Sequence, residues 1–408
     1  MRQIVIMMLP IALLAGNLDT LVQESFDSEP IKIAQANLQS VELENEAIEE
    51  SYMPHVYVGG NANMIDKEGF GNARQSSAIY TKALATLYDG GKKGAYEKQY
   101  DSKIKAKKAQ LQSDKNQQAL MTVEAYFSVL NVLEQKRAKE QESEQLTQEI
   151  KRFELFYKAG TVSADQVEKI RASKAQNEAT LAELDLALQK AQLNLEWLVG
   201  KKSVVEKGSK FEEPAWSEVN TRADIEAMES DVNGAKHNIE IIGATTKPNV
   251  QLQGVYTHSQ YAYNNERFDP NFPENQAKVT VSAEWKVFDF GMNKKQKQVS
   301  ELGYIVAKEQ LDSQTRLAQL ELANAEKSLQ IAKAKIDAAQ ARVDASNKTY
   351  EAINQKFHAN IVDNITYLDA LSDKYDALAS LQIAYNDYEV NKANYYYQAG
   401  IKLEEKIQ

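Results

Sequence analysis

The sequence contains two short motifs that resemble parts of known active sites, but neither has the neighbours that its chemistry requires. Asp289-Phe290-Gly291 spells the magnesium-binding motif of protein kinases, yet no catalytic loop or glycine-rich phosphate loop accompanies it. The run from Gly90 to Gly94 suggests a phosphate cradle, but it lacks the spacing and the Lys-Ser/Thr ending of a P-loop. A tight turn from a strand into a helix explains both motifs better.

Other residues that could do chemistry are scattered. The four histidines are His55, His237, His258 and His358, and no two of them have the spacing of metal ligands. The chain has no cysteine, which excludes disulfides, thiolate metal sites and thiol nucleophiles. Carboxylates are plentiful, but no segment combines them with the other polar groups of an active site. The sequence therefore predicts no catalytic residue, no metal site, no cofactor and no enzymatic activity.

Composition predicts long helices and excludes one class of partner. With 43% apolar residues the chain can bury a core, and glycine and proline are scarce at 17 and 7 of 408 residues. The net charge is −10 and the lysines are interspersed with acids. Because binding to phosphates needs a concentrated basic patch, we expect no nucleic-acid partner.

The N-terminus has the pattern of an export signal. Arg2 is followed by an apolar run from Ile4 to Leu14 and then by small residues, which are the three parts of a secretory signal. The run is too short to span a membrane, and no other segment has the roughly 20 apolar residues of a transmembrane helix. We predict a signal peptide over residues 1–16, with an ordinary buried helix as the alternative.

An internal repeat organises the rest of the chain. Pro54 matches Pro248 at an offset of 194, whereas Asp89 matches Asp289 and Gly200 matches Gly400 at an offset of 200. A longer loop in the second copy accounts for the difference. We predict a first repeat over residues 17–200, a linker over 201–221, a second repeat over 222–400 and a C-terminal tail over 401–408.

Each copy begins with a helix and continues as two strands. Helical spacing of apolar residues covers residues 30–51 and 222–243, and the two prolines end these helices. Alternation with a period of two follows, then a polar loop, then a second alternating run. Four such runs, each about as long as a tilted membrane strand, predict strands of an outer-membrane barrel.

The last of these runs separates into two faces. The residues predicted to face lipid are Val279, Val281, Ala283, Trp285 and Val287. The residues predicted to face the lumen are Lys278, Thr280, Ser282, Glu284 and Lys286. Four aromatic residues, Trp285, Phe288, Tyr88 and Tyr52, lie near the ends of the strands where an interfacial girdle is expected.

The strands lead into very long helices that turn back once. Residues 92–158 contain no proline and one glycine, at the start, and at 1.5 Å per residue such a helix spans roughly 100 Å. In the second copy an apolar seam from Leu322 to Phe357 recurs every seven residues, as in a coiled coil. Gly160 and Asn360 tolerate the left-handed conformation of a helix C-cap, and the returning helices end at Gly200 and Gly400.

Four strands cannot close a barrel, and an open sheet edge in lipid would leave backbone groups unsatisfied. Two chains would give eight strands, whose interior is filled by side chains, whereas three chains give twelve strands and a lumen. We therefore expect a homotrimer in contact with outer-membrane lipid.

The order helix, proline, strand, loop, strand, Asp-X-Gly, long helix, turn and helix, written twice, resembles the TolC family of outer-membrane efflux proteins. The resemblance covers nearly the whole mature chain. Its specific pieces are the two prolines, the segments 87–91 and 287–291, and the turns at Gly160 and Asn360. It implies a mostly helical fold with membrane strands: a periplasmic α-barrel of coiled-coil helices above which three chains form a twelve-stranded β-barrel.

The resemblance also implies a function and partners. The protein is expected to be the exit duct of a tripartite efflux or type I secretion system in the bacterial outer membrane, with its helices in the periplasm. It would passively conduct substrates delivered by an inner-membrane pump and a periplasmic adaptor. The turn residues expected to contact the adaptor are Ala159, Gly160, Thr161, Val162, Asp165, Ala359, Asn360, Ile361 and Val362.

In TolC-like channels two rings of aspartates constrict the periplasmic entrance. Asp369 takes the second aspartate position here, but Thr366 takes the first. The resemblance therefore implies one acidic ring, unless Asp363 also faces the pore. The alternative function is a periplasmic or surface coiled-coil scaffold in which the alternating runs form a soluble sheet, and neither reading identifies the cargo.

Overall fold

The computed structural model describes residues 15–216, 219–359 and 361–408. The chain divides into two compact units, which we describe separately. The helical unit comprises Met1–Gln35, Gln110–Asp224 and Thr315–Gln408, and the sheet unit comprises Ala36–Ala109 and Ile225–Gln314. The predicted signal peptide lies outside the described residues except for Ala15 and Gly16, which form the short strand β1.

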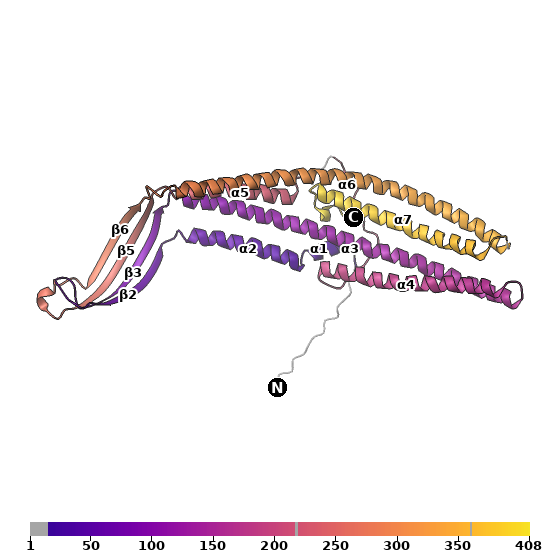
Figure 1. The fold of residues 1–408 in the computed structure, drawn as a ribbon, viewed down its shortest axis with the longest axis horizontal. Coiled ribbons are helices and arrows are strands. Elements are labelled where there is room, and N and C mark those ends of the chain that lie inside the picture. Colours follow the sequence, from indigo (N-terminus) through magenta and orange to yellow (C-terminus); the bar gives the residue numbers. More distant parts are fainter. Residues whose placement is uncertain (1–14, 217–218, 360) are drawn as a thin grey trace, which may run out of the picture. The chain divides into compact units, whose positions relative to one another are not determined.

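The order of elements repeats, as Figure 1 shows. The first repeat contains α2 (Glu29–Glu50), β2 (His55–Met64), β3 (Gln75–Tyr88), α3 (Lys92–Lys158) and α4 (Ala164–Val199). The second contains α5 (Ala223–Ala244), β5 (Asn249–Ala262), β6 (Asn275–Glu284), α6 (Met292–His358) and α7 (Asn364–Gln398). Besides β1, three short elements of the described residues lie outside this pattern: α1 (Leu18–Ser25), β4 (Val204–Val205) and the 3-10 helix η2 (Leu403–Glu405). A further 3-10 turn, η1 (Glu266–Phe268), lies in the second loop. The predicted fold class, long helices with four membrane-type strands in two tandem repeats, is confirmed.

The sheet unit is built on four antiparallel strands in the order β2-β3-β5-β6. In α2, α3, α5 and α6 the segments that belong to this unit follow the same order. Glu42 on α2 pairs with Lys108 on α3, and Asn238 on α5 donates to Ser300 on α6. A side-chain Cβ at Gly234 of α5 would lie 3.7 Å from the Cβ of Ser102 on α3, so these two helices are neighbours. The helices therefore lie side by side in the same order as the strands to which they connect.

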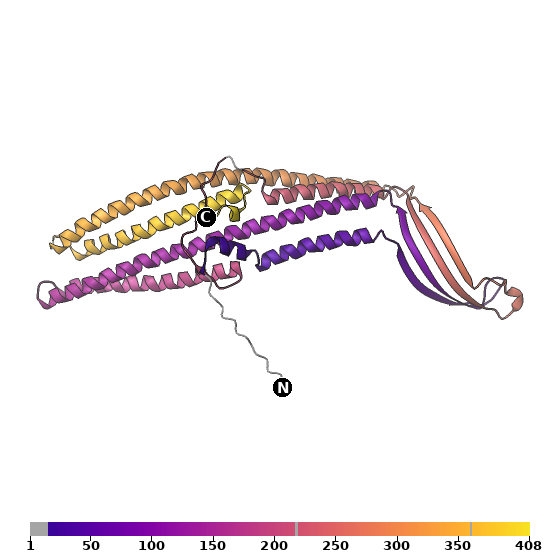
Figure 2. The same ribbon diagram turned by 180° about the vertical axis from the view of Figure 1, so that it is seen from behind.

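The helical unit has a conventional buried core. Its largest side chains with almost no exposure are aromatic, leucine or isoleucine, and they include Tyr126, Tyr367, Tyr396 and Leu146. The heptad seam of α6 is buried as expected, with Leu329 and Val343 exposed by 3% and 6%. In both views α4 and α6 lie on the outside of this unit, with α3 and α7 between them (Figure 2). Asn131 on α3 donates to Asp387 on α7 at 3.3 Å, which places these two inner helices side by side.

Two clusters of polar contacts bind the linker between the repeats to the helical unit, and the sequence did not reveal them. The Lys392 side chain is only 3% exposed; its ammonium lies 2.9 Å from Glu389 and donates to the Phe211 carbonyl at 2.7 Å. The Phe211 amide donates in turn to Glu389 at 2.7 Å, and the Tyr126 hydroxyl donates to the Glu206 carbonyl. Because both buried charges are paired and hydrogen-bonded, the linker is ordered here.

Candidate functional site

The strand register gives the sheet two faces of different chemistry. On one face β6 residues Val279, Val281 and Ala283 lie opposite Gly254, Leu252 and Val250 of β5. The register continues this face through Ala85, Ala83, Thr81 and Ile79 of β3 to Val56, Val58 and Gly60 of β2. The other face carries Lys278, Thr280 and Ser282 of β6 opposite Val255, Gln253 and Gln251, and then Lys82, Tyr80 and Tyr57.

The apolar face is open in the single chain. Val58 and Val279 are both 76% exposed, and Val281 is 63% exposed. A water-soluble sheet would bury such a face against a second layer. We therefore expect the apolar face to contact an apolar environment outside the protein and the polar face to contact water.

The structure places most of the predicted strand residues in these faces. Val279, Val281 and Ala283 share the apolar face, and Lys278, Thr280, Ser282 and Glu284 share the polar one. The strand ends at Glu284, earlier than the alternation predicts, so that Trp285, Lys286 and Val287 follow it. The Trp285 indole donates to the Thr246 carbonyl at 3.0 Å, which holds the ring at the end of the strand.

The sheet has two edges without partners. Among the described residues, no strand pairs with the outer edge of β2 or of β6. Both edge strands contain ten residues, so their unpaired backbone groups form rows of equal length. In an apolar environment such groups must be paired, and an exposed edge is a template for another strand.

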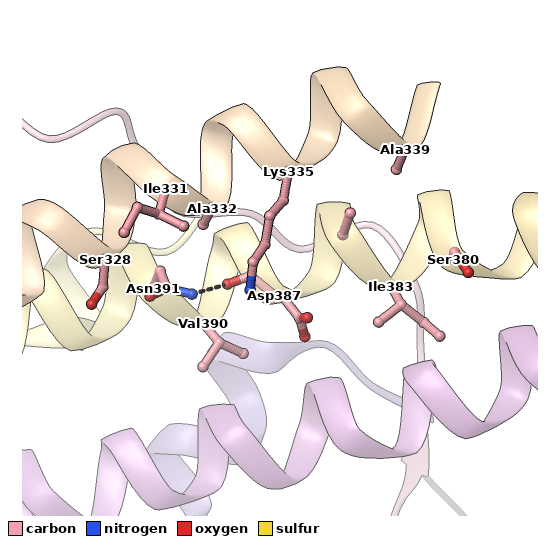
Figure 3. Close-up of a pocket in the computed structure, with 11 residues that line it drawn as sticks. Ser328, Ile331, Ala332, Lys335, Ala339, Ser380, Ile383, Asp387, Val390 and Asn391 are labelled. Carbon is pink, nitrogen blue, oxygen red and sulfur yellow. Dashed lines mark hydrogen bonds between the residues drawn. The ribbon is translucent and has the colours of Figure 1, made fainter. Parts of the chain in front are cut away.

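Apolar stripes also remain open on the two outer helices of the helical unit. Leu186, Leu193 and Trp197 on α4 are exposed by 53%, 55% and 66%, and they recur on one side of the helix. Between α6 and α7 a groove of about 500 Å³ opens (Figure 3). Its lining is mostly small or aliphatic, with Ile331 and Ala332 on α6 and Ile383 on α7.

The first hairpin turn joins α3 to α4. Gly160 has φ +75°, and the Thr161 amide donates to the Phe156 carbonyl at 3.0 Å, as in a glycine-terminated helix. Ala159, Gly160, Thr161 and Asp165 are exposed, whereas Val162 packs onto the core behind the turn. A hydrogen bond from the Ser163 hydroxyl holds the pKa of the Asp165 carboxyl below its usual value.

The second turn joins α6 to α7, and the predicted residue Asn360 lies outside the described residues. The Ile361 amide donates to the Lys356 carbonyl at 2.8 Å, which ends the helix as in the first turn. Ala359 is exposed and Ile361 is 70% exposed, while Val362 packs inward. The two turns are tied together, because the Asn364 amide side chain donates to the Gln166 carbonyl at 2.9 Å.

The three predicted constriction residues have different roles at the start of α7. The Asp363 carboxylate accepts the Thr366 amide at 2.9 Å and caps the helix, and this bond lowers the pKa of Asp363. Thr366 and Asp369 are exposed, while Tyr367, Ala370 and Leu371 on the other side of the helix are buried. Asp369 is therefore free to face a lumen, whereas Asp363 is already committed to a structural hydrogen bond.

A half-buried arginine behind the turns joins the two hairpins. Arg152 on α3 contacts Glu149 at 2.8 Å and His358 on α6 at 3.1 Å. The Phe153 ring stacks on Phe357 at 5.4 Å, and Phe357 stacks on Tyr367 at 4.2 Å. Burial raises the pKa of Glu149, although Arg152 opposes this shift. The heptad pattern did not reveal this cluster, because its charged members occupy positions that read as solvated helix faces.

The motifs that imitate active sites have structural roles. The Asp289 carboxylate accepts the amides of Gly291 and Asn293 at 3.0 Å and so caps α6, just as Asp89 caps α3. In the described part of the chain, no group of three or more histidines and carboxylates is placed to hold a metal ion. Within the described ranges, none of the helices is both long and apolar enough to cross a membrane.

Residues 218–396 match the family model described as Outer membrane efflux protein. The second repeat thus carries the sequence pattern of that family, and the predicted resemblance to TolC-like outer-membrane efflux proteins is confirmed. The predicted location, the bacterial outer membrane with the helices in the periplasm, is confirmed through the same family. None of the curated proteins matches the chain by sequence.

Solved structures show the same fold. The outer membrane protein VceC of Vibrio cholerae is 16% identical, with a TM-score of 0.81 over 94% of this chain and 96% of that one. The CmeC outer membrane channel of Campylobacter jejuni is 14% identical, with a TM-score of 0.81 over 94% and 85%. The open MtrE outer membrane channel of Neisseria gonorrhoeae is 16% identical, with a TM-score of 0.77 over 95% and 89%.

Proposed function

We propose that the chain is one protomer of a trimeric exit duct, which passively conducts substrates of a tripartite efflux or type I secretion system. The observation that carries this proposal is the two-faced sheet with two unpaired edges. Three copies joined edge to edge give twelve antiparallel strands, because β2 and β6 run in opposite directions and can pair with each other. Closure removes the open edges and puts the apolar face on lipid and the polar face on the lumen.

The outer helices of the helical unit support the same assembly. The hairpin turn precedes the start of α4. Leu186 and Leu193 lie about six and eight helical turns beyond that start. The α6 side of the groove in Figure 3 lies about five to eight turns from the corresponding end of α6. Rotation about a threefold axis parallel to these helices leaves each residue at the same level along the axis. The exposed apolar residues of α4 in one protomer would therefore face the groove between α6 and α7 in the next.

Because the chain lacks cysteine, this contact can be tested by paired substitutions. Leu186→Cys combined with Ile331→Cys should form disulfides between chains, giving covalent dimers and trimers after oxidation. Leu186→Cys combined with Ile361→Cys is the matched control, because Ile361 lies at the hairpin turn and not at the height of Leu186. Equal cross-linking in both pairs would reject this packing.

The mass of the protein in mild detergent tests the assembly itself. We expect a trimer that remains with outer membranes during washing and gives ion conductance in planar bilayers. The alternative, a coiled-coil scaffold with a soluble sheet, predicts that the protein stays soluble without detergent and gives no conductance. A monomer or dimer as the only stable species would overturn the duct.

The hairpin turns are the proposed contact for a periplasmic adaptor, through which an inner-membrane pump would deliver substrate. The exposed residues Ala159, Gly160, Thr161 and Asp165 of the first turn, and Ala359 and Ile361 of the second, support this role. Gly160→Trp should leave trimers intact and abolish export, because a large side chain would cover the exposed turn. Normal export by an assembled Gly160→Trp trimer would confine Gly160 to capping α3.

A further inference from the structure

Phe290 is placed in a way that nothing within its own chain explains. The residue is 93% exposed and has φ +54°, a left-handed conformation that residues other than glycine rarely adopt. Its ring meets Phe288 edge-on at 4.6 Å, and Phe288 is itself 73% exposed. Local strain is combined here with an exposed pair of aromatic rings.

The first repeat has glycine at the corresponding position, and the structure shows why. Gly90 has φ +78°, and a Cβ there would lie 2.5 Å from the Ala244 carbonyl oxygen and 2.9 Å from the Lys247 Cβ. The end of α5, which belongs to the following repeat, lies directly against this turn. Only glycine fits such a close approach.

The repeat relation identifies what is missing beside Phe290. Helices α2 and α5 correspond over their full lengths at the offset of Pro54 and Pro248, so Glu50 and Met53 correspond to Ala244 and Lys247. Among the described residues no helix equivalent to α2 follows α7, and the strand order leaves β6 at an edge. Met53, which lies three residues after the end of α2, is also 63% exposed.

We infer that Phe290 packs against the end of α2 of a second copy of this chain, in contact with Met53. This inference rests on the proposed ring of protomers, in which β6 of one copy meets β2 of the next. Within one chain, the turn at Gly90 lies against the end of α5. If the turn at Phe290 lay equally close to the end of α2 in the second copy, the Phe290 side chain would clash with the Glu50 carbonyl. The distance between turn and helix is therefore larger between protomers than within one, and the Phe288–Phe290 pair fills the extra space.

The chemistry of the contact fits this occupant. Methionine is flexible and makes favourable sulfur contacts with aromatic rings, so that it adapts to a junction that the repeat does not define. An aromatic residue at the centre of an interface buries a large area and loses little side-chain freedom. Around the ring, close contacts between Gly90 and the end of α5 within a chain alternate with wider contacts between Phe290 and the end of α2 of the next chain.

Cross-linking tests the contact directly. Met53→Cys combined with Phe290→Cys should join chains into covalent trimers when the assembled protein is oxidised. Met64→Cys combined with Phe290→Cys is the control, because Met64 is at the far end of β2 and is also exposed, by 72%. Trimers of normal mass without cross-linking above this control would overturn the inference and leave the duct intact, whereas failure to form trimers would overturn both.

A second variant separates assembly from folding. Phe290→Gly makes the turn like that of the first repeat and relieves the left-handed strain, so the unassembled chain should be at least as stable as the wild type. Loss of a central aromatic contact should raise the dissociation constant of the trimer about thirtyfold. Phe70→Ala, at an exposed ring in the loop between β2 and β3, should leave that constant unchanged. An unchanged constant for Phe290→Gly would overturn the contact between Phe290 and the second copy.

Discussion

The two units of the chain place their apolar residues in opposite ways. In the helical unit Tyr126, Tyr367 and Leu371 are fully buried, whereas in the sheet unit Val58 and Val279 are 76% exposed. The helical unit satisfies its apolar surface mostly within one chain, as a protein in water does. The sheet unit does not, and this difference fits the proposed contacts with lipid and with further copies of the chain.

The largest effect expected in the helical unit comes from its core. Leu371→Ala should lower the free energy of unfolding by about 2–5 kcal/mol, because Leu371 is fully buried and its loss leaves a cavity. Leu186→Ala, at a residue 53% exposed, should cost less than about 0.5 kcal/mol in the unassembled chain. Denaturant unfolding in mild detergent measures both, and similar costs would break the distinction between the two environments.

Substitutions in the sheet unit should change stability only when the sheet is in lipid. Val281→Arg should destabilise the assembled barrel by about 2–4 kcal/mol per chain, because it puts a charge on the apolar face. Thr280→Arg, one residue away on the polar face, should be tolerated. The fraction of trimer in extracted membranes measures the effect, and the opposite order for the two variants would mean that the predicted faces are reversed.

The turns of the helical unit depend on local hydrogen bonds. Asp363→Ala should lower the free energy of unfolding at neutral pH, because it removes the cap of α7. Since the pKa of Asp363 is lowered in the folded chain, its contribution is present above the unfolded value of about 3.9 and is lost as the pH falls through the folded value. Wild type and variant should therefore converge in acid.

Thermal unfolding at several pH values measures this convergence. Asp373→Ala is the matched control, because it removes an exposed carboxylate about three turns further along α7 that does not cap the helix. An equal cost for both variants, or a gap that persists at low pH, would show that the Asp363 carboxylate is not the stabilising group.

The sequence was sufficient for features that follow from periodicity. Alternation separated Val281 from Thr280, the heptads located the seam through Leu329 and Val343, and the prolines marked the ends of α2 and α5. It was insufficient where chemistry depends on contacts between distant segments. The Glu149–Arg152–His358 cluster joins two hairpins, and Lys392 binds a linker some 180 residues earlier in the chain.

The predicted girdle shows the same limit in another form. Its aromatic residues were recognisable at the ends of the strands, but the early end of β6 at Glu284 and the left-handed Phe290 were not. Both depend on what lies beside the turn in space. Comparing Gly90 with Phe290 required the position of Ala244, which no local pattern contains.

The smallest expected effect on stability, and the most specific one on conduction, belongs to Asp369. The residue is exposed on α7 opposite the buried Leu371, so Asp369→Ala should change the free energy of unfolding by less than about 0.5 kcal/mol. In a trimer three such carboxylates would face one another across the entrance and attract multivalent cations. Planar-bilayer conductance, with a polyvalent cation added on the periplasmic side, should show block of the wild type and loss of block in the variant. Asp373→Ala, one turn further along α7, should retain the block, whereas equal block in wild type and Asp369→Ala would move the constriction to Asp363 or to uncharged residues.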